Sequence, residues 1–243
     1  MCPIIAHFGP FPVHSYGLML AVAVMVSSFL LARDAARIGI AREVIYDLVF
    51  WVVLSGILGA RIFYVILSWD SFASQPLEIL MIYKGGLAWQ GSFIGGLAGG
   101  LIFIRRHGLP LWPLLDLVAP YIALGQSIGR IGCLLNGCCY GKPAAWGLYF
   151  PVWEERLIPT QIFMSLGQLL IFGILRGLQG KPGANGRIFV AYLLLSSVER
   201  FGIEFLRADH DLYWGLSIFQ YVCLMIFMSA LVLLARLSSK GRS

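Results

Sequence analysis

The sequence predicts an all-α polytopic membrane protein, and its composition and its hydropathy pattern both lead to this prediction. Of 243 residues, 59% are hydrophobic and 12% are charged, whereas soluble proteins are about half apolar and about a quarter charged. A soluble protein of this composition could not cover its surface with polar groups. The high apolar content also excludes a disordered chain and a disulfide-stapled secreted module. The apolar residues run in long blocks without period-2 alternation, which excludes an outer-membrane barrel.

Seven segments are long and apolar enough to cross a hydrocarbon core, which takes roughly 20 residues of helix. They are Val13–Ala32, Ile45–Leu67, Leu87–Ile104, Leu111–Ile128, Gln161–Leu175, Ile188–Phe205 and Trp214–Leu234. The fourth segment contains Asp116 and two prolines, and the fifth is short. No cleaved signal peptide is expected, because no basic region precedes the first segment. We therefore expect one membrane domain, residues 1–243, that is a seven-helix bundle with an outer loop at 129–160.

The positions of Lys and Arg predict the orientation, because cytoplasmic loops are enriched in them. With the N-terminus outside and the C-terminus cytoplasmic, eleven of the 18 cations fall on the cytoplasmic side. They are Arg33, Arg37, Arg42, Arg105, Arg106, Arg176, Lys181, Arg187, Arg236, Lys240 and Arg242. The net charge of +6 is therefore largely a topology signal, and no nucleic-acid partner is expected.

The seven remaining cations are candidates for function, because an arginine at membrane depth is costly unless it is paired or reaches water. They are Arg61, Lys84, Arg130, Lys142, Arg156, Arg200 and Arg207. Arg200, Glu204 and Arg207 share one helix face, so Glu204 could simply neutralise the two arginines. Arg61 and Arg130 have no carboxylate nearby in the sequence. Guanidinium groups without carboxylates suit a phosphate, and a phospholipid headgroup is the phosphate that a membrane presents.

Glycines surround the candidate cations at the start of the third segment. Close helix packing through small residues explains the glycines from Gly95 to Gly100. It explains Gly85 and Gly86 less well, because these two precede the segment, and backbone without side chains can approach a ligand closely. Gln90 is expected to point into the segment, where its amide must find a partner.

Three cysteines, Cys133, Cys138 and Cys139, fall in the stretch from Gly129 to Pro143 that begins with Gly-Arg. Their spacing is unfavourable for zinc, which favours closely paired ligands with a second pair elsewhere. A disulfide between the adjacent Cys138 and Cys139 would be strained. We therefore expect small buried side chains here, in preference to a metal or redox site. The chain has no nucleophile-elbow serine, metalloprotease helix or P-loop, so an enzyme of this sequence would position two substrates and form no covalent intermediate.

The chain resembles the prolipoprotein diacylglyceryl transferases of bacteria from about Tyr16 to Asp209. The motifs that carry the resemblance occur in the family's order: Tyr16-Gly17, Gly59-Ala60-Arg61, Gly85-Gly86-Leu87, Asp116, the stretch from Gly125 to Gly141, Pro159-Thr160-Gln161, and Glu199-Arg200 through Glu204-Phe205-Leu206-Arg207. The glycine–arginine stretch together with the last motif makes the resemblance specific.

The resemblance implies a seven-helix bundle in the bacterial cytoplasmic membrane, with the N-terminus outside and the active site toward the outer face. Members transfer the diacylglyceryl group of phosphatidylglycerol to the thiol of the lipobox cysteine of a prolipoprotein and release glycerol phosphate. Arg130 and Arg200 are then the catalytic pair, with Arg130 in contact with phosphatidylglycerol. The other implied substrate-binding residues are Tyr16, Arg61, Gly86, Gln90, Asn136, Glu204 and Arg207. No cofactor and no metal are implied.

The chain departs from the family pattern at three positions and in one loop. Gln90 stands where many members have a histidine, Cys133 where they have asparagine, and Ile158 where they have the histidine of His-Pro-Thr-Gln. Gln90 cannot act as a base. The outer loop from Lys142 to Ile158 is short. Two alternatives stay open: a paralogue that uses the same lipid donor with another acceptor, and a lipid or anion transporter, although no internal repeat of the transporter kind is visible.

Overall fold

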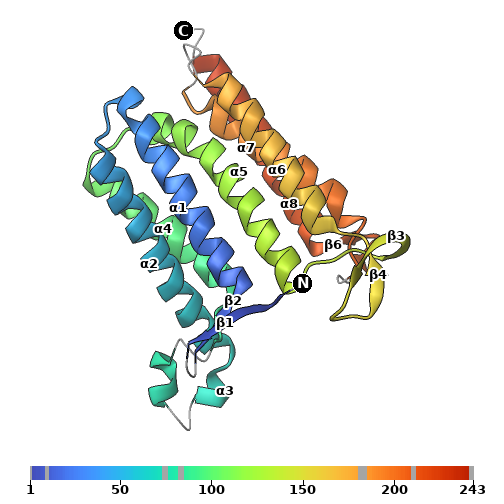
Figure 1. Cartoon of the computed structure of the whole chain (residues 1–243). Helices are drawn as coiled ribbons and strands as arrows, with labels where there is room; N and C mark the ends of the chain where they lie inside the picture. The colour runs from blue at the N-terminus through green and yellow to red at the C-terminus, as the bar shows by residue number, and fades with distance from the viewer. Residues whose placement is uncertain are drawn as a thin grey trace. The chain divides into compact units, whose positions relative to one another are not determined.

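The computed structural model is mostly helical and describes residues 2–8, 11–72, 76–81, 85–179, 185–208 and 212–240 (Figure 1). Each of the seven predicted segments overlaps one long helix. These helices are α1 (Ser15–Ala35), α2 (Arg42–Leu67), α4 (Trp89–Arg106), α5 (Leu111–Asn136), α6 (Thr160–Leu178), α7 (Arg187–Glu204) and α8 (Ile218–Lys240). Three cations of the charge analysis, Lys84, Lys181 and Arg242, lie outside the described residues.

Among the described residues, five helices are long and apolar enough to cross a membrane: α1, α2, α5, α6 and α8. Many large apolar side chains on them are exposed, including Phe50, Leu170 and Met225. Such surfaces fit a lipid environment, because soluble proteins rarely expose contiguous apolar patches of this extent. The 18 residues of α4 and of α7 would span about 27 Å at 1.5 Å per residue, but these helices carry more glycine or more charge. The chain is therefore a helical membrane protein with several spans.

The chain divides into two compact units, and the smaller one covers Ala32–Leu111. It contains η1 (Ala36–Ile38), α2, α3 (Trp69–Phe72), η2 (Pro76–Leu80) and α4. Helices α2 and α4 pack so closely that a Cβ atom on Gly91 would collide with the Gly59 carbonyl oxygen, and one on Gly95 with the Ser55 carbonyl oxygen. The prediction that the glycines from Gly95 to Gly100 serve close helix packing is confirmed.

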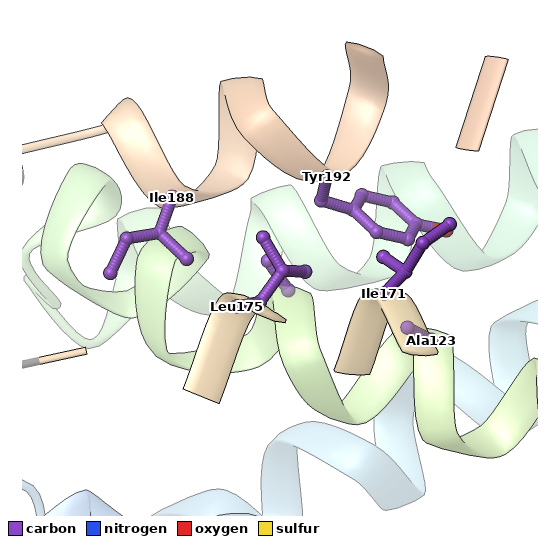
Figure 2. Close-up of a cluster of buried hydrophobic side chains, with 6 residues drawn as sticks. Ala123, Ile171, Leu175, Ile188 and Tyr192 are labelled. Atoms are coloured by element: carbon purple, nitrogen blue, oxygen red, sulfur yellow. The ribbon is translucent and has the colours of Figure 1, made fainter. Parts of the chain in front are cut away.

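The larger unit covers Met1–Leu31 and Trp112–Ser243. Its core lies where α5, α6 and α7 meet (Figure 2). Ala119 and Ala123 of α5 allow close approach, and the longer side chains of the other two helices fill the space between them. The members of this cluster are Ala119, Ala123, Ile171, Leu175, Ile188 and Tyr192. This packing fixes the three helices that carry Arg130, Gln161 and Arg200.

A buried carboxylate joins two of these helices. Asp116 of α5 accepts hydrogen bonds from the backbone N–H groups of Gly186 (2.7 Å) and Phe189 (2.8 Å) at the start of α7. The first N–H groups of a helix have no partner inside it, and a carboxylate both satisfies them and complements the helix dipole. An acidic residue in a predicted span is thereby explained as a helix cap supplied by a neighbouring helix.

Two features were not predicted. Helix α5 continues to Asn136, eight residues beyond the predicted end at Ile128; no proline lies in these eight residues, and the helix ends where Gly137 takes a left-handed φ of 75°. The expected outer loop at 129–160 therefore starts as helix, and Arg130 is a helical residue. Three short antiparallel hairpins also form: β1 (Ile4–Phe8) with β2 (Phe11–His14), β3 (Pro143–Phe150) with β4 (Glu155–Leu157), and β5 (Leu212–Tyr213) with β6 (Leu216–Ser217).

The cap formed by Asp116 predicts a loss of stability on substitution. Asp116→Ala would leave two N–H groups at the buried start of α7 without an acceptor, which costs about 1–3 kcal/mol. Thermal unfolding in detergent should show a clearly lower midpoint for this variant. The matched control is Asp47→Ala, which removes an exposed carboxylate from α2 and should change stability by less than about 0.5 kcal/mol. Equal midpoints for the two variants would contradict the capping role.

Candidate active site

Arg130 lies near the end of α5 at a pocket of about 110 Å³. The polar groups around the pocket are Arg130, Gln161 and Ser165, and its apolar walls are Ile131, Leu134, Ile162 and Leu166. Two of the wall residues are exposed, Ile131 by 41% and Leu166 by 60%. The pocket thus combines a cation with apolar walls that open onto the lipid-facing surface of α5 and α6.

The guanidinium of Arg130 has no hydrogen bond and no ion pair among the residues that the structure describes. It is half-buried. In the same pocket Gln161 is 1% exposed, and its Oε1 atom also lacks a hydrogen-bond partner within the described part of the chain. One donor group and one acceptor atom are therefore free to bind a ligand that carries both a negative charge and hydroxyl groups.

Arg200 of α7 is held in place by three contacts. Its Nη2 atom forms an ion pair with Oε2 of Glu204 at 3.0 Å, its Nη1 atom lies 3.6 Å from the sulfur of Met164, and its guanidinium carbon is 5.3 Å from the centre of the Phe219 ring. Ser217 donates a hydrogen bond of 2.9 Å to Oε1 of Glu204. The predicted shared face of Arg200 and Glu204 is confirmed, and the pair orients one side of the guanidinium.

Arg207 is brought to the same region by the chain that follows α5. Gly141 pairs with Arg207 as an isolated β-bridge, and the backbone N–H of Lys142 donates to the carbonyl of Leu206 at 2.8 Å. Arg207 is 9% exposed. Its charge lies within interaction range of Arg200 and of the Cys139 thiol. Backbone pairing therefore holds the end of α7 against the turn that follows α5.

Charge interactions place Arg130 in this group as well. The charge of Arg130 acts on Tyr16, on Glu199 and on Arg200. Tyr16, in the first turn of α1, is brought close because α1 and α5 pack tightly at Gly132. A Cβ atom on Gly132 would lie 2.9 Å from that of Met19 and 3.4 Å from the Cα of Tyr16. Tyr16, Arg130, Arg200, Glu204 and Arg207 thus share one region of the larger unit.

Glu199 is a member of this region that sequence reasoning did not select. Its carboxylate accepts a hydrogen bond from Gln168 of α6, and it fits only because residue 167 is glycine, since a Cβ atom there would collide with Glu199. No carboxylate lies near Arg130 along the sequence, but the fold supplies Glu199 from another helix. The signal for it in the sequence is its position directly before Arg200.

The turn after α5 is held by three side chains that bond to consecutive carbonyls. Trp153 donates to the carbonyl of Gly137 at 3.1 Å, Gln161 to that of Cys138 at 2.6 Å, and Thr160 to that of Cys139 at 2.6 Å. Asn136, the last residue of α5, interacts through its side chain with Cys138. Gln161 therefore connects the Arg130 pocket to this turn, and Asn136 belongs to the turn.

The turn brings three thiols together. The sulfur atoms of Cys133, Cys138 and Cys139 all lie within 4.8 Å of one another. Cys133 is buried, as expected, but Cys138 and Cys139 are only half-buried. Hydrogen bonds from the Cys133 and Cys138 thiols lower the pKa of Cys139, and the charges of Arg207 and Arg130 act in the same direction. The thiols converge because a helix end and a left-handed turn meet here, which sequence spacing alone did not indicate.

Arg61 lies in the smaller unit and is fully engaged by backbone. Its guanidinium donates to the carbonyls of Ile79 (2.8 Å), Gly85 (2.7 Å), Gly86 (3.0 Å) and Glu78 (2.6 Å), and it is 6% exposed. The carbonyl bonds account for this buried cation without a phosphate, because they use most of its five N–H donors. Arg61 therefore ties η2 to the two glycines that precede α4.

Gly86 lies just before α4, and Gln90 is the second residue of that helix. Gly86 has a φ of +77°, and a Cβ atom there would collide with the Tyr64 ring. Only glycine lets the carbonyl reach Arg61 in this way. Gln90 lies in the first turn of α4 and is exposed. Its amide is therefore not enclosed by the described helices of the smaller unit.

The chain is similar to known proteins over almost its whole length. The sequence model of the prolipoprotein diacylglyceryl transferases matches residues 3–236. The chain is 37% identical over 238 residues to the phosphatidylglycerol–prolipoprotein diacylglyceryl transferase of Trichormus variabilis, covering 91% of this chain and 84% of the relative. The enzymes of the same name are 36% identical in Synechococcus elongatus, covering 92% of this chain and 83% of the relative, and 34% identical in Bacillus cereus, covering 94% and 89%. The chain therefore belongs to the prolipoprotein diacylglyceryl transferase family.

Proposed function

We propose that this enzyme transfers the diacylglyceryl group of phosphatidylglycerol to the thiol of a prolipoprotein lipobox cysteine, forming a thioether and releasing glycerol phosphate. The observation that carries the proposal is the guanidinium of Arg130, which has no partner among the described residues and lies in a pocket with exposed apolar walls. A phosphate with attached acyl chains matches both properties. The names of the relatives identify the donor and the acceptor.

The reaction is a displacement at the glycerol carbon that carries the phosphate. The acceptor thiolate forms the new C–S bond, the C–O bond to phosphate breaks, and its electron pair stays on the departing phosphate oxygen. The phosphate gains one negative charge in this step. Preorganised cations in a poorly solvated site stabilise such charge most effectively. The nucleophile comes from the substrate, which explains why no catalytic serine or cysteine is needed in the enzyme.

The site residues then take separate roles. Arg130 binds the phosphate of phosphatidylglycerol, and Arg200 and Arg207 stabilise the charge that develops on it. Glu204 orients Arg200 through their ion pair, and Tyr16 and Asn136 shape the site. The free Oε1 atom of Gln161 is suited to accept a hydrogen bond from a glycerol hydroxyl of the headgroup. Arg61, Gly86 and Gln90 belong to the smaller unit, where Arg61 positions the backbone before α4.

The orientation proposed for the chain is seven spans with the N-terminus outside and the C-terminus in the cytoplasm. The five apolar helices would each span the membrane, and α4 and α7, which are 18 residues long, would be the other two spans. Arg105 and Arg106 at the end of α4 and Arg187 at the start of α7 would lie in the cytoplasm, in agreement with the positive-inside rule. The ends of α5 and α7 that carry Arg130, Arg200 and Arg207 would then face the outer side of the bacterial cytoplasmic membrane.

The transfer reaction can be tested with purified protein, labelled phosphatidylglycerol and a lipobox peptide. The mass of the peptide should increase by one diacylglyceryl group. Arg130→Ala should lower the rate by about 100-fold or more, because it removes a preorganised donor to the developing charge. Arg130→Lys keeps the charge but loses bidentate binding, so its rate should lie between those of the wild type and the alanine variant.

The matched control is Arg156→Ala, which removes an exposed arginine of β4 and should leave the rate unchanged. Full turnover in Arg130→Ala would contradict the proposal. If the wild type leaves the peptide unmodified but binds the lipid in an Arg130-dependent manner, the donor is right and the acceptor is another molecule.

The orientation can be tested in intact cells with a protease applied from outside. A cleavage site inserted at Glu154, in the turn of the β3–β4 hairpin, should be cut. A site inserted at His107, after α4, should be cut only once the cells are opened. Because the two sites flank α5 alone, cleavage of both in intact cells, or of the His107 site but not the Glu154 site, would contradict the proposed direction of α5. Transfer activity measured on the uncut proteins shows that the insertions leave the fold intact.

A further inference from the structure

The Arg130 pocket contains two neutral polar residues, Gln161 and Ser165, in addition to its cation. The displacement at the glycerol carbon requires only the cation, so these two residues need another explanation. Both belong to α6, and because they are four residues apart they share one helix face. The other hydrogen bonds that each of them makes determine what it can offer to a ligand.

The amide of Gln161 has a single possible orientation. Its Nε2 atom donates to the carbonyl of Cys138 at 2.6 Å. A carbonyl oxygen can only accept, so the amide cannot be turned over. The Oε1 atom therefore lies on the other side, where it is buried and has no hydrogen-bond partner among the described residues. A buried acceptor without a donor raises the free energy of the protein, and a donor that enters the pocket removes this cost.

The hydroxyl of Ser165 can also only accept. It donates its one proton to the carbonyl of Ser127 on α5 at 2.9 Å, and Ser127 donates in return to the carbonyl of Ser165 at 2.8 Å. The two Oγ atoms lie 3.2 Å apart, which leaves at least one lone pair of Ser165 for a ligand. These reciprocal bonds hold α5 against α6 beside the pocket, and Arg130 follows Ser127 by three residues on the same face of α5.

We propose that Gln161 Oε1 and Ser165 Oγ accept hydrogen bonds from the two hydroxyl groups of a phosphoglycerol headgroup whose phosphate is bound by Arg130. The two side chains thereby select the lipid donor by its headgroup. This inference deepens the proposed function and rests on it. One cation and two acceptors are the complement of one phosphate and two hydroxyl groups, and phosphatidylglycerol presents this set.

The same pocket disfavours other phospholipid headgroups. An ethanolamine headgroup would place a second cation beside the guanidinium of Arg130. A serine headgroup would bring a carboxylate toward the two acceptor oxygens and toward Glu199, whose charge interacts with that of Arg130. Phosphatidic acid has no headgroup alcohol and would leave both acceptors without a donor. Like charges and polar groups left unpaired are the features by which a site rejects a competing ligand most strongly.

A series of lipids tests the inference on the unmodified protein. The four lipids share their acyl chains and carry one phosphate charge: phosphatidylglycerol, the two phosphatidylpropanediols that each lack one hydroxyl, and phosphatidylpropanol, which lacks both. Each competes with labelled phosphatidylglycerol for the full-length protein in detergent. The Kd should rise about threefold to tenfold for each hydroxyl removed. Equal Kd values for the four lipids would overturn the inference.

Two variants assign the hydroxyl groups to their partners. Gln161→Met and Ser165→Ala should each bind phosphatidylglycerol about threefold to tenfold more weakly, and in each variant one of the two phosphatidylpropanediols should bind as tightly as phosphatidylglycerol. The wild-type lipid series and Ser165→Ala keep the test decisive if Gln161→Met does not fold.

The matched controls are Thr160→Val and Ser127→Ala. Each removes a neighbouring structural hydrogen bond, to the carbonyl of Cys139 or of Ser165, and neither residue lines the pocket. Both controls should keep the wild-type ratios of Kd among the four lipids. Loss of these ratios in the controls to the same extent as in Gln161→Met and Ser165→Ala would show that the side chains act only through the fold, and would overturn the inference.

Transfer assays with the same four lipids separate this inference from the proposed function. A wild type that modifies a lipobox peptide with equal kcat/KM from all four lipids overturns the inference and leaves the proposed function intact. A wild type that modifies no peptide but binds the lipids according to their hydroxyl groups supports the headgroup site and contradicts the proposed acceptor.

Discussion

A charged guanidinium at membrane depth raises the free energy of the protein unless it is paired or solvated. Three arginines lie within or near the end of a predicted span, and each is stabilised in a different way. Arg61 binds four backbone carbonyls, so its charge is used to fold the segment before α4. Arg200 pairs with Glu204 and lies against Phe219, so part of its donor capacity remains. Arg130 has no such partner in the described chain. The function depends on this difference, because only an incompletely satisfied cation gains free energy when an anion arrives.

The turn after α5 connects these cations to the rest of the larger unit. Three carbonyls in a row are bonded by side chains, and two of those side chains, Thr160 and Gln161, belong to the first turn of α6. The turn is also joined to the end of α7 through Gly141 and Arg207. Because α5, α6 and α7 share one packed core, a shift of any of these helices would move the phosphate-binding residues relative to one another. Preorganisation of this kind is what electrostatic catalysis requires.

The sequence predicted the helices well because apolar runs of membrane length leave little choice of structure. The ends of the helices were predicted less well, and α5 is the informative case. Glycine and arginine after Ile128 lower the local hydropathy, but helix formation in a membrane protein depends on backbone bonding, which continues to Asn136. The predicted loop start was wrong for that reason.

The site was predicted in part because its members fall in local motifs. Arg200 and Glu204 follow helical spacing, so their pairing could be read directly. The role of Arg61 could not, because its partners are carbonyls 17 to 25 residues further along the chain. Glu199 and the three thiols were underestimated for a similar reason: their proximity to other groups is created by helix packing and by a left-handed turn. Spacing along the sequence describes only neighbours on one regular element.

The open side of the Arg130 pocket also answers how a lipid donor reaches a charged site. Phosphatidylglycerol diffusing in the membrane presents its phosphate at the headgroup level, with its acyl chains in the hydrocarbon. A pocket enclosed by protein would force the acyl chains to leave lipid. Ile131 and Leu166 instead form an exposed apolar edge beside the guanidinium, so the phosphate can reach Arg130 while the chains stay in the bilayer. The product keeps both chains and can leave by the same route, whereas the glycerol phosphate, which has none, leaves to water.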